Sequence, residues 1–219
     1  MTRIISILAA VVVVALGGWY FLGGGDDAPG QSDSGYAFSE TASEFGLTEM
    51  ALGNPEAPVT IIEYASYTCP HCARFHNGAF KQLKADYIDT GKINFVYREV
   101  YFDRPGLWAS MVARCGGTEK FHGITELIYK DQSGWARAGD PAAIVAELGK
   151  IGRLAGLDGD TLDACLKDAA MAENLTKWED QNLKQDSIDS TPSFVINGKK
   201  YTNMAYEDMK ALIETALGT

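Results

Sequence analysis

The fold of this chain is decided by the stretch Val59-Thr-Ile-Ile-Glu-Tyr-Ala-Ser-Tyr-Thr-Cys-Pro-His-Cys72. Its first seven residues are apolar and rich in β-branched side chains, a composition that predicts a buried strand. After the second cysteine, the residues from Ala73 to Tyr87 have the apolar spacing of a helix. A CxxC motif at a strand-to-helix junction is typical of a redox site.

The position of Cys69 at the start of a helix explains why the motif suits redox chemistry. The N-terminus of a helix offers unpaired N–H groups and the positive end of the helix dipole, and both stabilise a thiolate. Two intervening residues keep the second thiol within reach of the first. We therefore expect Cys69 to be the exposed nucleophile and Cys72, one turn into the helix, to be the resolving thiol of a redox-active disulfide.

A zinc site is one alternative, and it would use Cys69, Cys72 and one or both of His71 and His76. Structural zinc usually takes a second pair of ligands elsewhere in the chain. The other two cysteines, Cys115 and Cys165, stand alone and form no second CxxC motif. We therefore expect no metal at this motif, and nothing in the sequence calls for a cofactor.

Two further alternatives concern the same two cysteines. Covalent haem attachment requires histidine directly after the second cysteine, and this position holds Ala73, which excludes it. A purely structural disulfide would close so short a loop that it would constrain the unfolded chain little. Redox chemistry is the favoured interpretation.

The overall composition limits the size of the core and the class of partner. With 219 residues, 46% of them hydrophobic, the chain can bury one core, or one core and an inserted subdomain. The formal net charge of −10 argues against a nucleic acid partner. Four cysteines, an even number, fit an oxidising compartment.

The first residues supply evidence for export. After Arg3, residues 4–22 are apolar except for Ser6, and this run is long enough to span a bilayer. We assign residues 1–23 to an uncleaved membrane anchor, with a cleaved signal peptide as the alternative. Residues 24–45, rich in Gly, Ser and Asp, are expected to form a flexible linker. Either interpretation exports the domain predicted over residues 46–219.

The rest of the chain alternates between strand and helix patterns. Lys92 to Val100 predicts a second strand, parallel to the first because a helix connects them. Between about 103 and 187 we expect a helical insertion, with helices near 105–115, 119–131, 141–155, 160–169 and 171–186. Its helix-start signals include Asp103-Arg104-Pro105 and Asp140-Pro141, and glycines, among them the region around Gly134, separate the helices. A strand at 193–196, the hairpin signal Asn197-Gly198, a strand at 199–202 and a helix at 206–217 complete the chain.

These features together resemble one family. Glu63 to Cys72, the helical insertion, and Ser190-Thr-Pro-Ser-Phe-Val-Ile-Asn-Gly198 are similar to the DsbA-like thiol–disulfide oxidoreductases of the thioredoxin superfamily. The resemblance covers about residues 50–219. It implies an α/β thioredoxin fold with an inserted helical subdomain, preceded here by the hydrophobic N-terminal segment and the tether.

The resemblance also implies roles for residues outside the motif. Pro192 corresponds to the family's cis-proline facing the two cysteines, and it leaves the backbone of Thr191 free to pair with a client; the alternative is a trans proline that starts a strand. Glu63 corresponds to a buried carboxylate able to take a proton from Cys72; the alternative is a solvent-facing strand residue.

The histidines and the remaining cysteines complete the candidate set. We expect His71 to set the redox poise, because its imidazole can favour the Cys69 thiolate and so stabilise the reduced form. His76 and His122 are assigned no role. We expect a structural disulfide between Cys115 and Cys165 within the insertion, with two free thiols or a second redox pair as alternatives.

The predicted function is oxidation of cysteines in exported polypeptides. By resemblance, a DsbB-like quinone reductase in the membrane would recycle the enzyme, which we expect to be a monomer in the periplasm of a Gram-negative bacterium, tethered by residues 4–22 or released. Thr191 also occurs at this place in isomerase and reductase branches, so a reduced isomerase or reductase is one alternative. A tethered chaperone that needs no cysteines is another.

Overall fold

The computed structural model describes residues 43–218. The predicted anchor at residues 4–22 and nearly all of the predicted linker lie outside this range. Among the residues that are described, no helix combines the length and the apolar composition needed to cross a membrane.

The centre of the fold is a five-stranded sheet in the order β1-β3-β2-β4-β5. Its strands are β1 (Met50–Gly53), β2 (Val59–Ala65), β3 (Ile93–Glu99), β4 (Ser193–Ile196) and β5 (Lys199–Thr202). The predicted parallel pairing of β2 with β3 is confirmed, and the other neighbours pair antiparallel. Strand β2, which the sequence analysis predicted just before the cysteine motif, therefore lies in the middle of the sheet, between β3 and β4.

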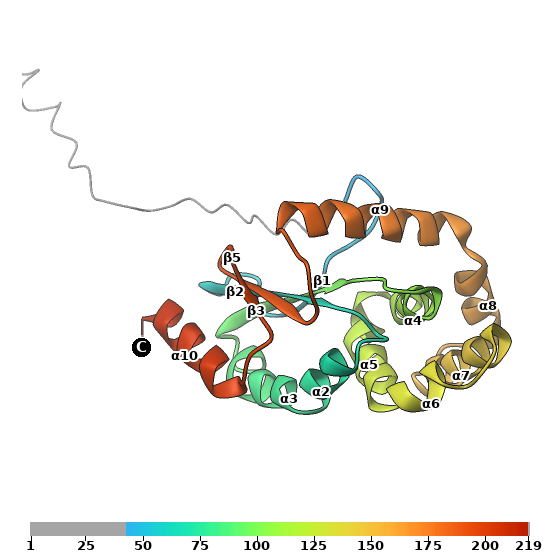
Figure 1. Ribbon diagram of the computed structural model, residues 1–219, viewed down its shortest axis with the longest axis horizontal. Coiled ribbons are helices and arrows are strands. Elements are labelled where there is room, and N and C mark those ends of the chain that lie inside the picture. The colour runs from blue at the N-terminus through green and yellow to red at the C-terminus, as the bar shows by residue number, and fades with distance from the viewer. Residues whose placement is uncertain (1–42, 219) are drawn as a thin grey trace, which may run out of the picture. The chain divides into compact units, whose positions relative to one another are not determined.

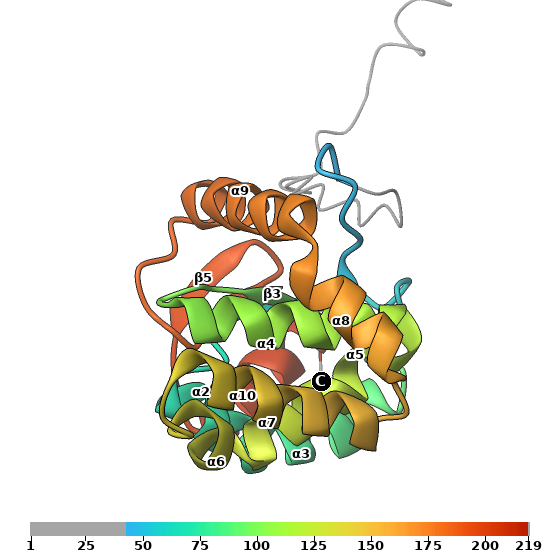
Figure 2. The same cartoon turned by 90° about the vertical axis from the view of Figure 1, so that its right-hand side faces the viewer.

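Helices cover both faces of the sheet. After the cysteine motif come α2 (Pro70–Asn77), α3 (Ala79–Leu83) and the π-helix η1 (Lys84–Ile88). The insertion holds α4 (Arg104–Cys115), α5 (Gly117–Lys130), α6 (Gln132–Ala136), α7 (Pro141–Leu154), α8 (Gly159–Lys167) and α9 (Ala169–Gln185). The last helix is α10 (Tyr206–Leu217). In two perpendicular views α9 lies over one face, while α2, α3 and α10 lie beneath the other (Figures 1 and 2).

The alternation of side chains along β2 explains these two layers. Val59, Ile61 and Ala65 join the larger core cluster, to which the helices around the cysteine motif contribute. Ile62 and Tyr64 point to the opposite face and join a smaller cluster, against which Leu183 at the end of α9 packs. A strand buried on both faces is expected to be apolar throughout. Glu63, the acidic residue of β2, departs from this expectation.

Aspartate side chains begin four of the insertion helices. The carboxylate of Asp103 accepts a hydrogen bond from the N–H of Gly106 at 2.8 Å, and that of Asp140 accepts one from Ala143 at 2.9 Å. Asp158 and Asp168 do the same for α8 and α9. The aspartate-proline start signals of α4 and α7 are thereby confirmed.

Two expectations about the elements were wrong, and one strand was not expected. The single helix predicted over 73–87 is broken at Gly78, whose backbone (φ −127°, ψ −95°) is not helical, and it ends in the π-helix η1. The region around Gly134, predicted to separate two helices, forms the short helix α6. Strand β1 was not predicted, because four residues at a sheet edge take their conformation from pairing with β3 rather than from their own pattern.

Two links hold the insertion together and attach it to the sheet. A disulfide joins Cys115, the last residue of α4, to Cys165 in α8. The guanidinium of Arg114 donates two hydrogen bonds to the carboxylate of Glu99 at the end of β3, at 2.6 and 2.7 Å. Both of these side chains are buried.

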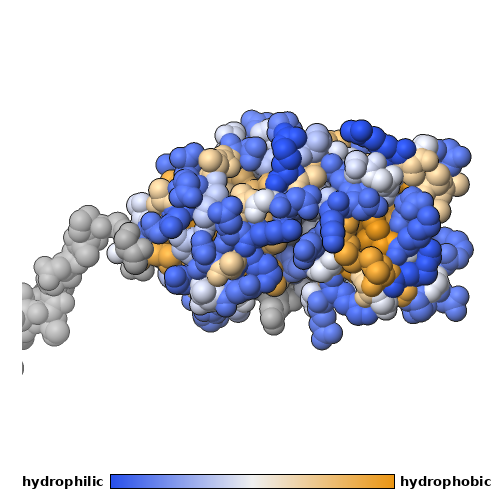
Figure 3. Space-filling model, turned by 90° about the horizontal axis from the view of Figure 1, so that it is seen from below, coloured by the Kyte–Doolittle hydropathy of each residue, from blue (hydrophilic) through white to orange (hydrophobic). Residues whose placement is uncertain are grey.

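The surface on the side of α2, α3 and α10 is mostly hydrophilic, with apolar residues gathered in one area toward the insertion (Figure 3). Within residues 43–218, the large apolar side chains with high exposure are Phe102 and Leu154. This distribution agrees with the acidic net charge of the chain.

Candidate active site

The two cysteines lie where the central strand meets the first helix beneath the sheet. Cys69 is the residue before the first turn of α2, with an extended backbone, and Pro70 opens the helix. Proline suits the first position of a helix because the N–H at this position has no partner within the helix, and proline has no N–H. Its fixed φ also matches that of a helix. Cys72 lies one turn further on, on the buried side of the helix.

The turn that carries Cys69 is held from two directions. The N–H of Cys69 donates to the carbonyl of Ser66 at 3.0 Å. From the insertion, the carboxamide of Gln132 at the start of α6 donates to the carbonyls of Tyr67 and Cys69, both at 2.8 Å. The helical insertion therefore contributes directly to the geometry of the reactive turn.

The loop before β4 closes the site on the other side of Cys69. The peptide bond between Thr191 and Pro192 is cis. The Cys69 thiol donates to the carbonyl oxygen of Thr191, with 3.6 Å between Sγ and the oxygen. The fold thus brings together Cys69, Cys72, Thr191 and Pro192, which are far apart in the sequence.

The two thiols are free in this structure and both are buried, so the expectation that Cys69 is exposed was wrong: 6% of this residue is accessible, because the helix start packs against the loop before β4. The surroundings of the two thiols act on their pKa values in opposite directions. A hydrogen bond from the Cys72 thiol, followed by those from Thr191 and from the backbone N–H groups of the first turn, lowers the pKa of Cys69 to about 5. For Cys72, burial raises the pKa far above its usual value, and the hydrogen bond to Cys69 and the negative charge of Glu63 act in the same direction. The site therefore holds one thiolate at neutral pH and one protonated thiol.

Glu63 is the acidic residue of β2, and its side chain is fully buried beneath the cysteines. It faces the side of the sheet that α2 covers, between Tyr97 on β3 and Phe194 on β4. Its Oε2 lies 2.9 Å from the Nε2 atom of His76, whereas Oε1 is buried without a hydrogen-bond partner among the described residues. The structure thus places Glu63 inside the protein and not on a solvent-facing strand.

His76 is the site residue that the sequence analysis missed. It lies one helical turn after Cys72 on the buried side of α2, and its side chain is 4% exposed. Its ring stacks on that of Tyr129 with 4.3 Å between the centroids. The i, i+4 spacing from Cys72 predicts that both side chains lie on one helix face, and that spacing was the available signal.

His71 lies at the exposed surface of the first helical turn. Its Nδ1 accepts a hydrogen bond from the guanidinium of Arg74 at 2.6 Å. The contact of His71 that lowers the pKa of Cys69 is made by its backbone N–H. Stabilisation of the Cys69 thiolate by the His71 imidazole stays a prediction. The imidazole would act on the thiolate while it is hydrogen-bonded to Arg74.

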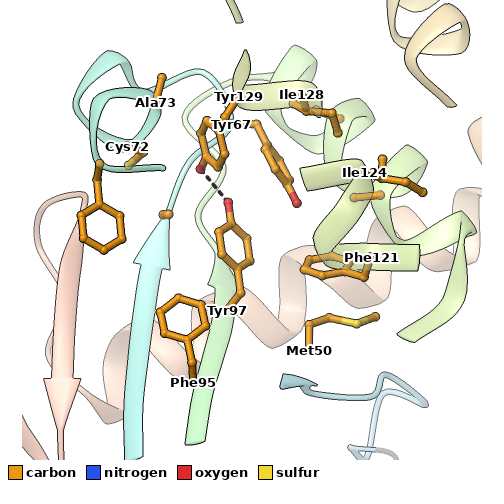
Figure 4. Packing of buried hydrophobic residues seen from close by; sticks show 14 of the residues in the cluster. Met50, Tyr67, Cys72, Ala73, Phe95, Tyr97, Phe121, Ile124, Ile128 and Tyr129 are labelled. Atoms are coloured by element: carbon orange, nitrogen blue, oxygen red, sulfur yellow. Dashed lines mark hydrogen bonds between the residues drawn. The ribbon is translucent and has the colours of Figure 1, made fainter. Parts of the chain in front are cut away.

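Aromatic side chains pack on the buried side of the site, next to Cys72 (Figure 4). Tyr67, Tyr97 and Tyr129 gather beside Cys72, and the hydroxyls of Tyr97 and Tyr129 meet at 2.7 Å (Figure 4). The hydroxyl of Tyr67 bonds to Thr125 on α5 at 2.8 Å. Within residues 43–218, no group of three or more histidine, cysteine or acidic side chains is arranged to hold a metal ion.

Comparisons with known proteins agree with this architecture. The family model described as thioredoxin matches residues 46–215. A relative in Rickettsia bellii, provisionally named a protein-disulfide oxidoreductase, is 34% identical over 170 residues, which cover 77% of this chain and 64% of that protein. Disulfide bond formation protein D of Bacillus subtilis is 28% identical over 174 residues, covering 76% of each chain. The chain thus spans less than two thirds of the length of the Rickettsia relative.

Two solved structures share the fold over most of their length. The crystal structure of alpha-DsbA1 from Wolbachia pipientis superposes with a TM-score of 0.71 at 26% identity, covering 81% of this chain and 96% of that one. Oxidised BdbD from Bacillus subtilis superposes with a TM-score of 0.69 at 25% identity, covering 78% and 94%. With the thioredoxin model matched over most of its length, the chain belongs to the thioredoxin family, and it is similar in sequence and fold to DsbA-type proteins of that family.

Proposed function

We propose that this protein is a thiol–disulfide oxidase that introduces disulfides into exported polypeptides. A client thiolate attacks Sγ of Cys69 in the Cys69–Cys72 disulfide, which forms a client–Cys69 disulfide and expels Cys72 as a thiolate that then takes up a proton. A second client thiolate attacks the client sulfur of that bond, and Cys69 leaves as a thiolate. The client gains one disulfide, and the enzyme is left with two reduced cysteines.

The observation that carries this proposal is the low pKa of Cys69, about 5. A thiolate stabilised in the reduced protein makes the reduced form more stable, and the corresponding disulfide is then more oxidising. A low pKa also makes Cys69 a good leaving group when the client is released. Both effects favour transfer of the disulfide to a client.

The surrounding residues have separate roles in this scheme. Pro192 and Thr191 form the wall against which an extended client would lie beside Cys69. Glu63, beneath Cys72, would exchange the proton that this thiol gains and loses. His71 would adjust the stability of the Cys69 thiolate. The Cys115–Cys165 disulfide would be structural, since it lies in the insertion and links α4 to α8.

The cellular setting of the proposal comes from the sequence. Residues 4–22, as an anchor or a signal, would place the domain in the periplasm, where disulfides persist. Recycling requires an oxidant, and we propose a DsbB-like quinone reductase in the membrane. We further propose that the protein acts as a monomer.

A reduced isomerase or reductase is a second candidate, because of Thr191. Its carbonyl oxygen lies 3.6 Å from the Cys69 Sγ, and its side chain contributes to lowering the pKa of Cys69. A hydroxyl at this place could ease release of a mixed disulfide and shift the balance of the cycle. The reduction potential distinguishes the two candidates.

The test is the reduction potential of the Cys69–Cys72 pair in the full-length protein. The protein is equilibrated in glutathione buffers, the thiols are trapped by alkylation, and the peptide with both cysteines is quantified by mass spectrometry. We expect a value near about −120 mV, whereas a value at or below about −220 mV would contradict an oxidase. Cys115→Ala/Cys165→Ala is the control and should leave this value unchanged.

A further inference from the structure

We propose that His76 carries protons between the buried carboxylate of Glu63 and a cavity beside α2, and so connects Cys72 to solvent. This inference rests on the proposed function, because it concerns the proton that Cys72 exchanges during the cycle. It gives a positioning and proton-carrying role to a residue that lies outside the CxxC motif.

Glu63 cannot deliver a proton to solvent by itself. Its side chain is fully buried, and so is Cys72. A proton passed from the Cys72 thiol to Glu63 would therefore remain inside the protein unless a further group accepted it. His76 is placed to do so, since its Nε2 lies 2.9 Å from the Glu63 Oε2.

His76 also lines a cavity. This cavity has a volume of about 270 Å³ and lies between the segment from α2 to η1 and helix α5. Its lining includes His76, Phe80, Lys84, His122 and Glu126. A volume of this size is ample for several waters, since a single water occupies about 30 Å³ in the liquid. His76 thus stands between the buried carboxylate and a space that water can enter.

The other titratable groups around His76 are poor proton carriers near neutral pH. Burial raises the pKa of Tyr97 on β3 and of Tyr129 on α5 well above their usual value, so both stay protonated. Across the cavity, burial lowers the pKa of His122 to about 4, which keeps it neutral. The charged groups at the rim of the cavity are Lys81, Lys84, Asp89 and Glu126. Among the described groups around this pair, Glu63 and His76 are left to exchange the proton.

The step is balanced when the reduced enzyme is reoxidised by a disulfide. The oxidant first forms a mixed disulfide with Cys69. The Cys72 S–H bond then breaks and its proton moves to Glu63, while the Cys72 sulfur attacks Cys69 Sγ and expels the oxidant's second thiolate. The Nε2 of His76 takes the proton from Glu63, and the ring loses a proton from its other nitrogen to the cavity. The oxidant gains two electrons, and Cys69 and Cys72 lose them.

The test separates the two chemical phases in the full-length protein. Reduced enzyme is mixed with oxidised glutathione over a range of pH, quenched with acid, and analysed by mass spectrometry for the fraction that carries glutathione. Formation of this species reports the attack by Cys69, and its decay reports the attack by Cys72. His76→Gln keeps an amide able to bond Glu63 but cannot carry a proton.

We expect His76→Gln to slow the decay phase by about tenfold or more, which is less than the roughly 100-fold typical of a group that exchanges a proton with the reacting atom itself, because Glu63 stays in place. The formation phase should keep the rate of the parent protein. His122→Gln is the matched control, since this side chain lines the same cavity and bonds to the carbonyl of Ala51 rather than to Glu63. It should leave both phases unchanged.

A rescue experiment distinguishes proton transfer from packing. His76→Ala enlarges the cavity next to Glu63, and added imidazole should restore the decay rate in proportion to its concentration. The proposal is overturned if His76→Gln decays at the parent rate, or if imidazole leaves His76→Ala unchanged. If oxidised glutathione left both Cys69 and Cys72 of the parent protein reduced, with neither a mixed disulfide nor a Cys69–Cys72 disulfide formed, the proposed function would instead be overturned, and the relay with it.

Discussion

At the scale of single residues, the site depends on two cysteines whose positions differ by one helical turn. Cys69 lies at the helix start, where N–H groups and the second thiol stabilise its negative charge. Cys72 lies inside the protein over a carboxylate, where negative charge is disfavoured. The difference between them follows from position and not from residue type.

The first prediction concerns the titration of these thiols in the reduced protein. The rate of alkylation by iodoacetamide should rise with pH through a midpoint of about 5 and then level off, because Cys69 is a thiolate above its pKa. Cys72 should stay unmodified. Cys72→Ala removes the hydrogen bond that lowers the pKa most, so its midpoint should move to higher pH. An unchanged midpoint in that variant would contradict this assignment.

The same shift has a consequence for stability. The pKa of Cys69 is lowered in the folded protein from a usual value of 9.0 to about 5. The reduced protein should therefore gain stability as the pH rises from about 5 to about 9, and lose it as the pH falls through that range. Urea unfolding of the reduced parent protein and of Cys69→Ser at several pH values measures this gain as the difference between the two proteins, because Glu179, whose pKa burial raises to about 7, titrates in the same range in both.

The sequence predicted the cysteine pair but not its supporting histidine. Cys69 and Cys72 are recognised from local spacing alone, because strand, motif and helix are contiguous. The contact between Glu63 and His76 depends on which face of β2 meets which face of α2, and that is decided by packing along the whole strand. A single acid in an apolar strand and a histidine one turn after Cys72 were both visible, but nothing local joined them.

At the scale of the elements, predictions held where the signal was local. The helix at 206–217, the Asn197-Gly198 hairpin and the aspartate-capped helix starts all follow from neighbouring residues. Strand β1 did not follow, because it depends on a distant partner strand. The break at Gly78 had a local signal, the glycine itself, which the helical pattern around it outweighed. Long-range pairing is the information that a local pattern lacks.

A further prediction concerns the disulfide between α4 and α8. Cys115→Ala/Cys165→Ala should lower the free energy of unfolding by up to about 4 kcal/mol, because the bond closes a loop of 50 residues in the unfolded chain. Urea unfolding of the two proteins, both with Cys69 and Cys72 oxidised, measures the difference. No loss of stability would show that the insertion is held by its packing alone.

At the scale of the whole molecule, the insertion and the sheet act as one body because of a buried ion pair. Arg114 on α4 holds Glu99 with two hydrogen bonds, donates to the carbonyl of Thr48 at 3.0 Å, and stacks over Trp178 of α9 at 4.9 Å. One side chain of α4 thus touches the sheet, the segment before β1, and helix α9.

The last prediction concerns this pair. Arg114→Met leaves the carboxylate of Glu99 buried without its partner and should cost about 3–5 kcal/mol. Adding Glu99→Met removes the buried carboxylate that has lost its guanidinium partner. The double variant should therefore be more stable than Arg114→Met alone. Urea unfolding of the single and double variants gives the coupling energy. If the double variant were the less stable of the two, the desolvation argument would be wrong.

The outer strand β5 has a consequence for how the protein tolerates its proposed clients. Its sequence begins Lys199-Lys200, and it lies at the end of the sheet with β4 on one side. An open strand edge is a template on which unfolded chains can add and aggregate, and lysines on such an edge oppose this. A protein that meets unfolded chains throughout its working life would thereby keep its own sheet from nucleating their aggregation.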